Sequence, residues 1–290
     1  MRLAVTGATG FLGWRATVVL RDRGHDVLAL ARPGGAARAH AHDLDATRID
    51  VGDPAVRELI ADRDAVLHFA GVPDPAGARR DPAGAVRANA GTTLNLLEAG
   101  VPLVYPSSVR AGLEPPPDPY AMSKRLGEDV SRRHPTPTIV VRLPSVFGPG
   151  QVRWEGATGA IAAFAARALD GEAIVIPGDP RRTRDFVYVD DVMVALEALV
   201  ADGRWGQSLA VSSRAPTPLL RAAELVRDAA ASDVPIELPG GELPPGEDRS
   251  YTSDQLLPTL DFAARPLEAA VFDYVAWLRA HPAAQGRARA

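Results

Sequence analysis

Apolar and polar positions alternate regularly along the first half of the chain. Short apolar runs predict strands at residues 2–6, 26–31, 65–69 and 103–105. Apolar residues at helical spacing predict helices at residues 14–23, 54–61, 83–99 and 119–133, and a further strand is predicted at residues 138–142. Strands that alternate with helices in this way predict an α/β fold built on a doubly wound parallel sheet.

The regular alternation ends at Pro144, and Gly148, Pro149 and Gly150 follow it closely. Beyond this point the pattern predicts helices near residues 159–169, 191–200 and 267–279, and strands at 173–176 and 185–189. The prolines that precede the last helix indicate connecting loops. We therefore expect a first domain at residues 1–145, to which residues 186–212 return, a smaller α/β domain at residues 146–185 and 213–280, and a tail at residues 281–290.

The composition excludes several classes of protein. The 290 residues include 32 basic and 36 acidic side chains, and the net charge of -4 argues against nucleic-acid binding. Because the chain has no cysteine, disulfides, cysteine zinc sites and iron–sulfur clusters are excluded. His40 and His42 lack a third ligand nearby, so we predict no metal site. The absence of a signal-peptide pattern and of any apolar stretch of ~20 residues favours a cytoplasmic protein with no membrane partner.

Gly7, Gly10 and Gly13 follow the first predicted strand and precede the first predicted helix. Glycines at this spacing let backbone amides and the positive end of the helix dipole approach a pyrophosphate. Strand, glycine turn and helix occur in the order that a dinucleotide site requires. We therefore interpret residues 1–145 as a dinucleotide-binding domain and the smaller domain as a substrate domain.

The second predicted strand ends at Ala31-Arg32, where a dinucleotide-binding fold contacts the adenosine ribose. A carboxylate at this place favours NAD, whereas an arginine accommodates the 2′-phosphate of NADP. No acidic residue is present here, and Arg38 is nearby in the sequence. The residues therefore favour NADP(H), and NAD(H) is the alternative.

Tyr120 and Lys124 are four residues apart in a predicted helix, which places both side chains on one face. A fixed ammonium stabilises the phenolate form of a tyrosine, so the two residues together can transfer a proton. Lys124 is the only lysine among the 32 basic residues, and a lysine can hydrogen-bond a ribose where the planar arginine head is bulkier. Because Ser107 and Ser108 end a predicted strand, a catalytic site at the carboxyl edge of the sheet is predicted.

Motifs are distributed over nearly the whole chain: the glycine turn at residues 6–13, His68-Phe69-Ala70-Gly71, Asn89-Ala90-Gly91-Thr92, Ser107-Ser108, Tyr120 with Lys124, Arg142-Leu143-Pro144, Phe147-Gly148-Pro149-Gly150 and Arg184-Asp185-Phe186-Val187-Tyr188-Val189-Asp190-Asp191. Together they resemble the extended short-chain dehydrogenases/reductases. Within that family the chain looks like the nucleotide-sugar epimerases, dehydratases and 4-ketoreductases, for which the last two motifs are rather specific.

The resemblance implies roles for individual residues. Tyr120 would be the general acid/base and Lys124 its partner and ribose ligand, with Ser108 as the third member and Ser107 as the alternative. The cofactor would contact Gly7, Gly10, Phe11, Leu12, Gly13, Arg32, Asp50, Val51, Phe69, Ala70, Gly71, Asn89, Tyr120, Lys124 and Leu143. The substrate would contact Ser108, Tyr120, Ser145, Arg184 and Arg249. Arg184 could instead form a salt bridge with Asp185 or Asp190.

Three functions are compatible with this pattern. The family's dehydratases carry an Asp-Glu pair after the catalytic hydroxyl, and Val109-Arg110 in this chain disfavour elimination. The leading hypothesis is a ketoreductase that transfers hydride from NADPH to a keto group of a nucleotide-linked sugar. The alternative is a nucleotide-sugar 4-epimerase that retains NAD. A non-catalytic dinucleotide sensor is a third hypothesis, but it would have no need for the serine, tyrosine and lysine.

Two further predictions concern packing. We interpret His68, Phe272 and Trp277 as core residues. The resemblance implies a homodimer formed through the helices at residues 83–99 and 119–133. Val86, Leu94 and Leu97 could supply apolar surface for that contact or could pack against the sheet.

Overall fold

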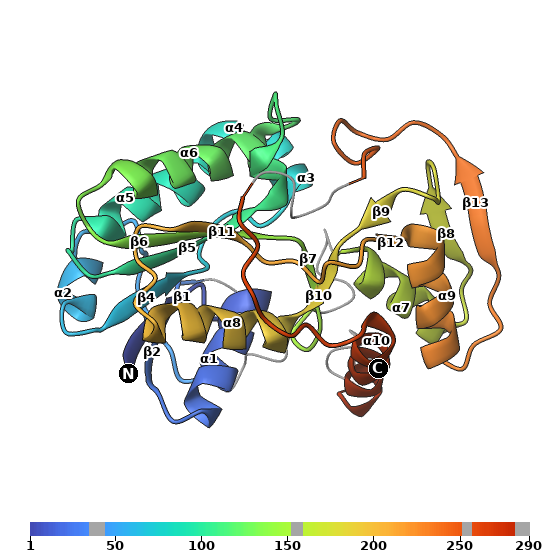
Figure 1. Ribbon diagram of the computed structural model, residues 1–290, viewed down its shortest axis with the longest axis horizontal. Coiled ribbons are helices and arrows are strands. Elements are labelled where there is room, and N and C mark those ends of the chain that lie inside the picture. The colour runs from blue at the N-terminus through green and yellow to red at the C-terminus, as the bar shows by residue number, and fades with distance from the viewer. Residues whose placement is uncertain (35–43, 152–158, 251–256, 282–290) are drawn as a thin grey trace.

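The computed structural model describes residues 1–34, 44–151, 159–250 and 257–281 (Figure 1). Its larger part is built on a seven-stranded sheet in which every pairing is parallel, with the strand order β11-β6-β5-β4-β1-β2-β3. The strands are β1 (Arg2–Thr6), β2 (Asp26–Ala31), β3 (Thr47–Arg48), β4 (Ala65–His68), β5 (Leu103–Ser108), β6 (Thr138–Leu143) and β11 (Ser208–Ala210). This sheet confirms the predicted α/β fold.

Helices cover both faces of the sheet (Figure 1). One face packs against α1 (Phe11–Asp22) and α8 (Val189–Ala201). The other face carries α2 (Val56–Ile60), α3 (Pro75–Arg80), α4 (Pro82–Val86), α5 (Thr92–Leu97) and α6 (Pro119–Arg133). Side chains on β1 alternate accordingly, because Leu3 and Val5 belong to the core under α1 and α8 and Ala4 belongs to the opposite core.

The helices on this second face largely follow the predicted bounds. A π-helical turn, Arg87–Gly91, joins α4 to α5, so the helix predicted at residues 83–99 is one nearly continuous segment. The helix α6 begins and ends at the predicted residues. His68 at the end of β4 is 1% exposed, which confirms its prediction as a core residue. In the described part of the chain, no helix is both long and apolar enough to span a bilayer.

The smaller part of the molecule has its own hydrophobic core. The helices α7 (Ala160–Asp170), α9 (Leu219–Ala229) and α10 (Leu267–Ala280) pack around the parallel pair β8 (Ile174–Pro177) and β13 (Ile236–Gly240). Phe147 makes an edge-to-face contact with Tyr274 at a centroid distance of 6.0 Å. The prediction for Phe272 is wrong, because this side chain on α10 is 62% exposed, whereas Trp277 packs against the core.

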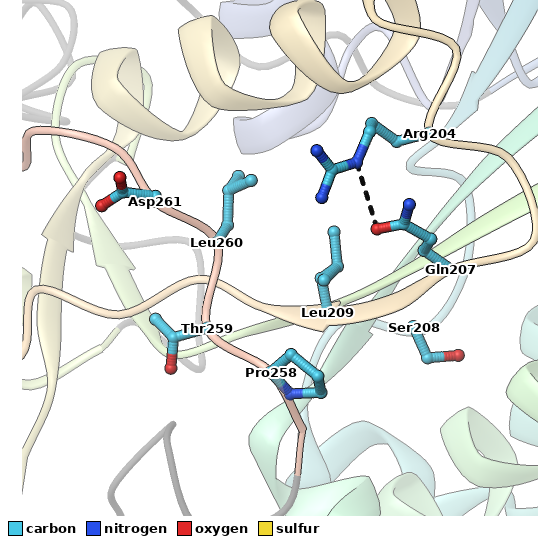
Figure 2. Close-up of a pocket in the computed structure, with 8 residues that line it drawn as sticks. All are labelled: Arg204, Gln207, Ser208, Leu209, Pro258, Thr259, Leu260 and Asp261. Atoms are coloured by element: carbon cyan, nitrogen blue, oxygen red, sulfur yellow. Dashed lines mark hydrogen bonds between the residues drawn. The ribbon is translucent and has the colours of Figure 1, made fainter.

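Short strand pairs lie between the two parts: β7 (Ser145–Phe147) pairs with β10 (Phe186–Tyr188), and β9 (Thr183–Arg184) pairs with β12 (Thr217–Pro218). The chain then returns through α8 to β11 at the edge of the large sheet. Residues 258–260 cover that edge, because the Ala210 amide donates to the Pro258 carbonyl at 3.0 Å and the Leu260 amide donates to the Ala210 carbonyl at 2.8 Å. Figure 2 shows this segment beside β11, around a pocket of about 430 Å³.

Candidate active site

A cavity of about 1490 Å³ is lined by residues from the carboxyl edge of the sheet and from the smaller part of the molecule. Most of the predicted site residues line it: Gly7, Gly10, Phe11, Leu12, Gly13, Arg32, Asp50, Val51, Phe69, Ala70, Gly71, Ser108, Tyr120, Lys124, Leu143, Ser145 and Arg184. Residues as far apart in the sequence as Gly7 and Arg184 therefore meet in one cavity.

Asn89 and Arg249 are not among the lining residues. Asn89 is buried, where its Oδ1 accepts a hydrogen bond from the Val72 amide at 2.9 Å and its Nδ2 donates to Ser123 Oγ at 2.9 Å. A Cβ atom on Gly71 would lie 2.2 Å from Asn89 Oδ1. Asn89 thus supports the loop after β4 from the side that faces away from the cavity. Arg249 is exposed, and its backbone carbonyl accepts a hydrogen bond from Arg184.

The glycine turn has the geometry that a pyrophosphate needs. Gly7 has a φ of +67°, and a Cβ atom on Gly13 would lie 2.3 Å from the Gly7 carbonyl oxygen. These two glycines therefore bring the start of α1 against the end of β1. Gly10 caps α1 without a side-chain hydrogen bond, so the first amides of the helix face the cavity without a capping side chain. The residues present fit a bound dinucleotide.

The end of β2 provides the residues expected at the adenosine. Arg32 directly follows β2, lines the cavity and is exposed. Asp50 accepts a hydrogen bond from the Gly52 amide at 2.8 Å, and both residues line the cavity beside Val51. Arg38, His40 and His42 lie outside the described residues. Within the described ranges, no cluster of three or more metal-ligating side chains occurs.

The helix α6 positions the tyrosine and the lysine. Asp118 caps the helix by accepting a hydrogen bond from the Ala121 amide at 2.9 Å, and Pro119 occupies the first helical position. Lys124 Nζ donates to the Pro106 carbonyl at 2.9 Å, and a hydrogen bond links Tyr120 to Ser108. Both contacts are to the end of β5, so the helix and the strand together fix the three catalytic candidates.

Burial dominates the electrostatics of this pair. Desolvation raises the pKa of Tyr120 to about 12, against the opposing effects of the Ser108 hydrogen bond and the Arg110 charge. Desolvation also lowers the pKa of Lys124 to about 8, and the charge of Glu128 opposes this shift. At neutral pH the phenol is therefore protonated and the lysine is charged.

The two neighbouring serines have different partners. Ser107 Oγ donates to Glu128 Oε1 at 2.6 Å in a buried position, and Ser108 is the residue bonded to Tyr120. Strand alternation points consecutive side chains in opposite directions, which separates the two roles. This geometry favours Ser108 over Ser107 as the member of the site.

Arg184 lines the cavity, but its guanidinium also donates to the carbonyls of Thr183, Arg249 and Glu247. Asp190, one of the partners considered for it, instead forms a bidentate ion pair with Arg15 at 2.5 and 2.8 Å. Arg184 therefore holds the segment that contains Glu247 beside the cavity.

The model of the NAD dependent epimerase/dehydratase family matches residues 3–210. This match covers more than half of the chain, including β1, the glycine turn, Tyr120 and Lys124. The protein belongs to the NAD-dependent epimerase/dehydratase family. This confirms the predicted resemblance and the prediction of an NAD(P)-dependent enzyme.

Family members that resemble the chain have different activities. The chain is 26% identical to a dTDP-4-dehydro-6-deoxy-D-allose reductase from Streptomyces bikiniensis, over 96% of both chains. It is 28% identical to a UDP-glucose 4-epimerase from Mycolicibacterium smegmatis, over 75% of this chain and 79% of that one. The structure of a Thermotoga maritima UDP-glucose 4-epimerase with UDP-glucose matches with a TM-score of 0.80 and 23% identity, over 97% of this chain and 100% of that chain.

Two residues in or beside the candidate site, Arg110 and Glu128, were not predicted from the sequence as site residues. Arg110 lines the cavity, forms a buried ion pair with Asp118 and donates to the Gly246 carbonyl at 2.8 Å. Glu128 is fully buried below Lys124 on α6. A carboxylate four residues after a lysine on a helix was the available signal for Glu128. The partners of Arg110 are distant in sequence, so no local pattern indicates it.

Proposed function

We propose that the protein is a ketoreductase that reduces a keto group of a nucleotide-linked sugar with NADPH. The observation that carries this proposal is the placement of Ser108, Tyr120 and Lys124 in the same cavity as the glycine turn and Arg32. A hydride donor bound along the turn and a proton donor on α6 can then act on one carbonyl. The reductase from Streptomyces bikiniensis supports a dTDP-linked keto-deoxysugar as the class of substrate.

The state of Tyr120 suits the reductive direction. A reduced nicotinamide dinucleotide held at the glycine turn of Gly7, Gly10 and Gly13 would supply hydride for the carbonyl carbon. The carbonyl oxygen gains the proton from Tyr120 Oη, whose pKa of about 12 keeps the phenol protonated at neutral pH. Ser108 hydrogen-bonds the phenol and can bond the same substrate oxygen. The positive charge of Lys124 favours the phenolate that proton transfer leaves, and its ammonium can also bond the ribose of the cofactor.

The preference for NADP(H) rests on Arg32. Its side chain follows β2, is exposed and lines the cavity. A 2′-phosphate there would make charge-assisted hydrogen bonds to Arg32. We place Asp50 and Val51 at the adenine, and Ser145 and Arg184 on the substrate side of the cavity.

A 4-epimerase that retains NAD is the second candidate. The similarity to the epimerase from Mycolicibacterium smegmatis favours it, because the same three side chains could serve oxidation and then reduction of a sugar. A non-catalytic dinucleotide sensor is disfavoured, since a sensor has no need for a buried tyrosine and lysine held at the end of β5.

Identification of the released dinucleotide tests the choice between these functions. Purified protein is denatured and the supernatant is analysed for NAD, NADP and their reduced forms. A reductase is expected to release little NAD and to bind added NADPH with micromolar affinity or better. Stoichiometric NAD in the supernatant would reject the reductase in favour of the epimerase.

A further inference from the structure

Three side chains spaced four residues apart on α6 contact three consecutive residues at the end of β5. Tyr120 is bonded to Ser108, Lys124 Nζ donates to the Pro106 carbonyl at 2.9 Å, and Glu128 Oε1 accepts from Ser107 Oγ at 2.6 Å. The proposed function uses the first two contacts. In the third contact, Ser107 lines the cavity, whereas Glu128 lies one helical turn further along α6 and does not.

Glu128 accepts four hydrogen bonds from three side chains. Its carboxylate is fully buried and accepts hydrogen bonds from Arg142 Nε and Nη2, each at 2.8 Å, in addition to the bond from Ser107. Arg132 Nη1 donates to the same group at 3.0 Å. Burial raises the pKa of Glu128, but the bonds from Arg142 and Ser107 outweigh it and lower the pKa overall. The carboxylate is therefore ionised at neutral pH.

We propose that Glu128 is a positioning residue of the active site, which fixes the end of β5 through Ser107 and keeps Lys124 charged. The inference rests on the proposed function, because Glu128 can position the active site only if Lys124 is part of that site. Ser107 is adjacent to Ser108, so the bond from Ser107 to Glu128 fixes the backbone that carries Ser108. A carboxylate one turn below the ammonium stabilises the charged form of Lys124.

Among the described residues that surround Lys124, Glu128 is the one that supplies a negative charge. Burial lowers the pKa of Lys124 to about 8, and Glu128 is the charge that opposes this shift. The Tyr105 ring lies 5.1 Å from Lys124 Nζ, and burial raises the pKa of this phenol. His68 is kept neutral, because burial and the charge of Lys124 lower its pKa to about 3. Tyr120 is protonated at neutral pH, and Arg142 lies beyond Glu128, bonded to it.

The single lysine allows a direct measurement. In full-length protein grown with lysine labelled at the side-chain nitrogen with ¹⁵N, the one Nζ resonance belongs to Lys124. Its chemical shift against pH should give a transition near pH 8 in the wild type. Because Glu128→Gln removes an opposing charge, the transition should move to lower pH by about one unit or more. The matched control is Arg132→Gln, which removes the partly exposed partner of the same carboxylate and should leave the transition unchanged.

Glu128→Gln could unfold the protein, because it leaves the buried Arg142 guanidinium without its partner. The same comparison is therefore also made in a variant that lacks Arg142. Arg142→Met and Arg142→Met/Glu128→Gln are then compared, and the Lys124 transition should be lower in the double variant by about one unit. Equal transitions in folded members of either pair would overturn the proposal for Glu128. Full activity of Tyr120→Phe would instead overturn the proposed function, so the two failures are distinguishable.

Discussion

Tyr120 presents a protonated phenol to the cavity, held by Ser108 on one side and by the start of α6 on the other. Replacing Tyr120 with Phe removes the transferable proton and leaves the ring and its packing in place. We expect turnover to fall by at least about 100-fold, while NADPH binding and thermal stability stay near wild type. Steady-state kinetics, cofactor titration and a melting curve measure these quantities. Near-wild-type turnover would exclude Tyr120 as the acid.

Lys124 should impose an upper pH limit on cofactor binding. Its pKa in the folded protein is about 8, below the ordinary value of 10.5, so the ammonium loses its proton as the pH rises through 8. Affinity for NADPH should be constant below this pH and should fall above it, by up to about tenfold per pH unit, because the charged form binds. Fluorescence titrations between neutral and alkaline pH test this. The Lys124→Arg variant should show no such pH limit. It should bind NADPH weakly and turn over slowly at all pH values, because the planar guanidinium cannot reproduce the geometry of the ammonium.

Arg32 decides the cofactor preference at the end of β2. We expect Arg32→Asp to weaken NADPH binding by about 1.5–3 kcal/mol, the value of a hydrogen bond to a charged group, and to improve NADH binding. Dissociation constants for both cofactors on wild type and variant measure the change. Tighter binding of NADH than of NADPH by the wild type would reject the preference for NADP.

At the scale of the element, the junction of β1, the glycine turn and α1 depends on close backbone contact. A Cβ atom on Gly13 would lie 2.3 Å from the Gly7 carbonyl oxygen, so Gly13→Ala must move α1 away from β1. We expect a loss of about 1–3 kcal/mol in the free energy of unfolding, and weaker dinucleotide binding as well. Gly91→Ala is the matched control, because Gly91 is exposed at the end of the π-helical turn and a Cβ atom there would meet no other part of the protein within 4 Å. Chemical denaturation should show no loss for this control.

Elements with local signals could be predicted, and elements set by distant contacts could not. The helix α6 has an aspartate cap, a proline in its first turn and regular apolar spacing, all within its own sequence. The helix α9 was not predicted although its buried residues Leu219, Ala222, Ala223 and Val226 recur at helical spacing, because the prolines that precede it were interpreted as part of a connecting loop. The pairing of Ile174 in β8 with Ile236 in β13 joins distant parts of the chain, so no local pattern indicates it.

The same limit applies inside the candidate site. The glycine turn, Tyr120 and Lys124 are recognisable because their spacing is itself the signal. Ser107 and Ser108 are neighbours with the same chemistry, and their different partners on α6, Glu128 and Tyr120, separate their roles. Asn89 belongs to one of the motifs of the family, but it is bonded to Val72 and does not line the cavity.

At the scale of the whole molecule, the helices on one face of the sheet leave apolar side chains exposed. Val86 on α4, Leu94 on α5, and Met122 and Leu126 on α6 are between 39% and 58% exposed, and these helices pack against one another. Leu97 instead packs in the core. A face of this kind suits a second copy of the chain, in agreement with the proposed homodimer.

Charge on this face should therefore separate the subunits. We expect wild-type protein to have twice the mass of one 30.6 kDa chain at micromolar concentration, and Leu126→Asp to have the mass of one chain. Phe272→Asp is the control, because it adds the same charge at an exposed apolar residue of α10. Light scattering with size-exclusion chromatography measures the masses. A monomeric wild type would contradict the dimer.

Reduction of a nucleotide-linked keto sugar tests the central proposal most directly. Wild type and Tyr120→Phe are incubated with NADPH and a dTDP-linked 4-keto-6-deoxyhexose, and NADPH loss and sugar alcohol formation are followed together. The ketoreductase account predicts that the wild type consumes one NADPH for each alcohol formed and that the variant forms almost none. No reduction by the wild type, together with interconversion of UDP-sugar epimers without added cofactor, would contradict it.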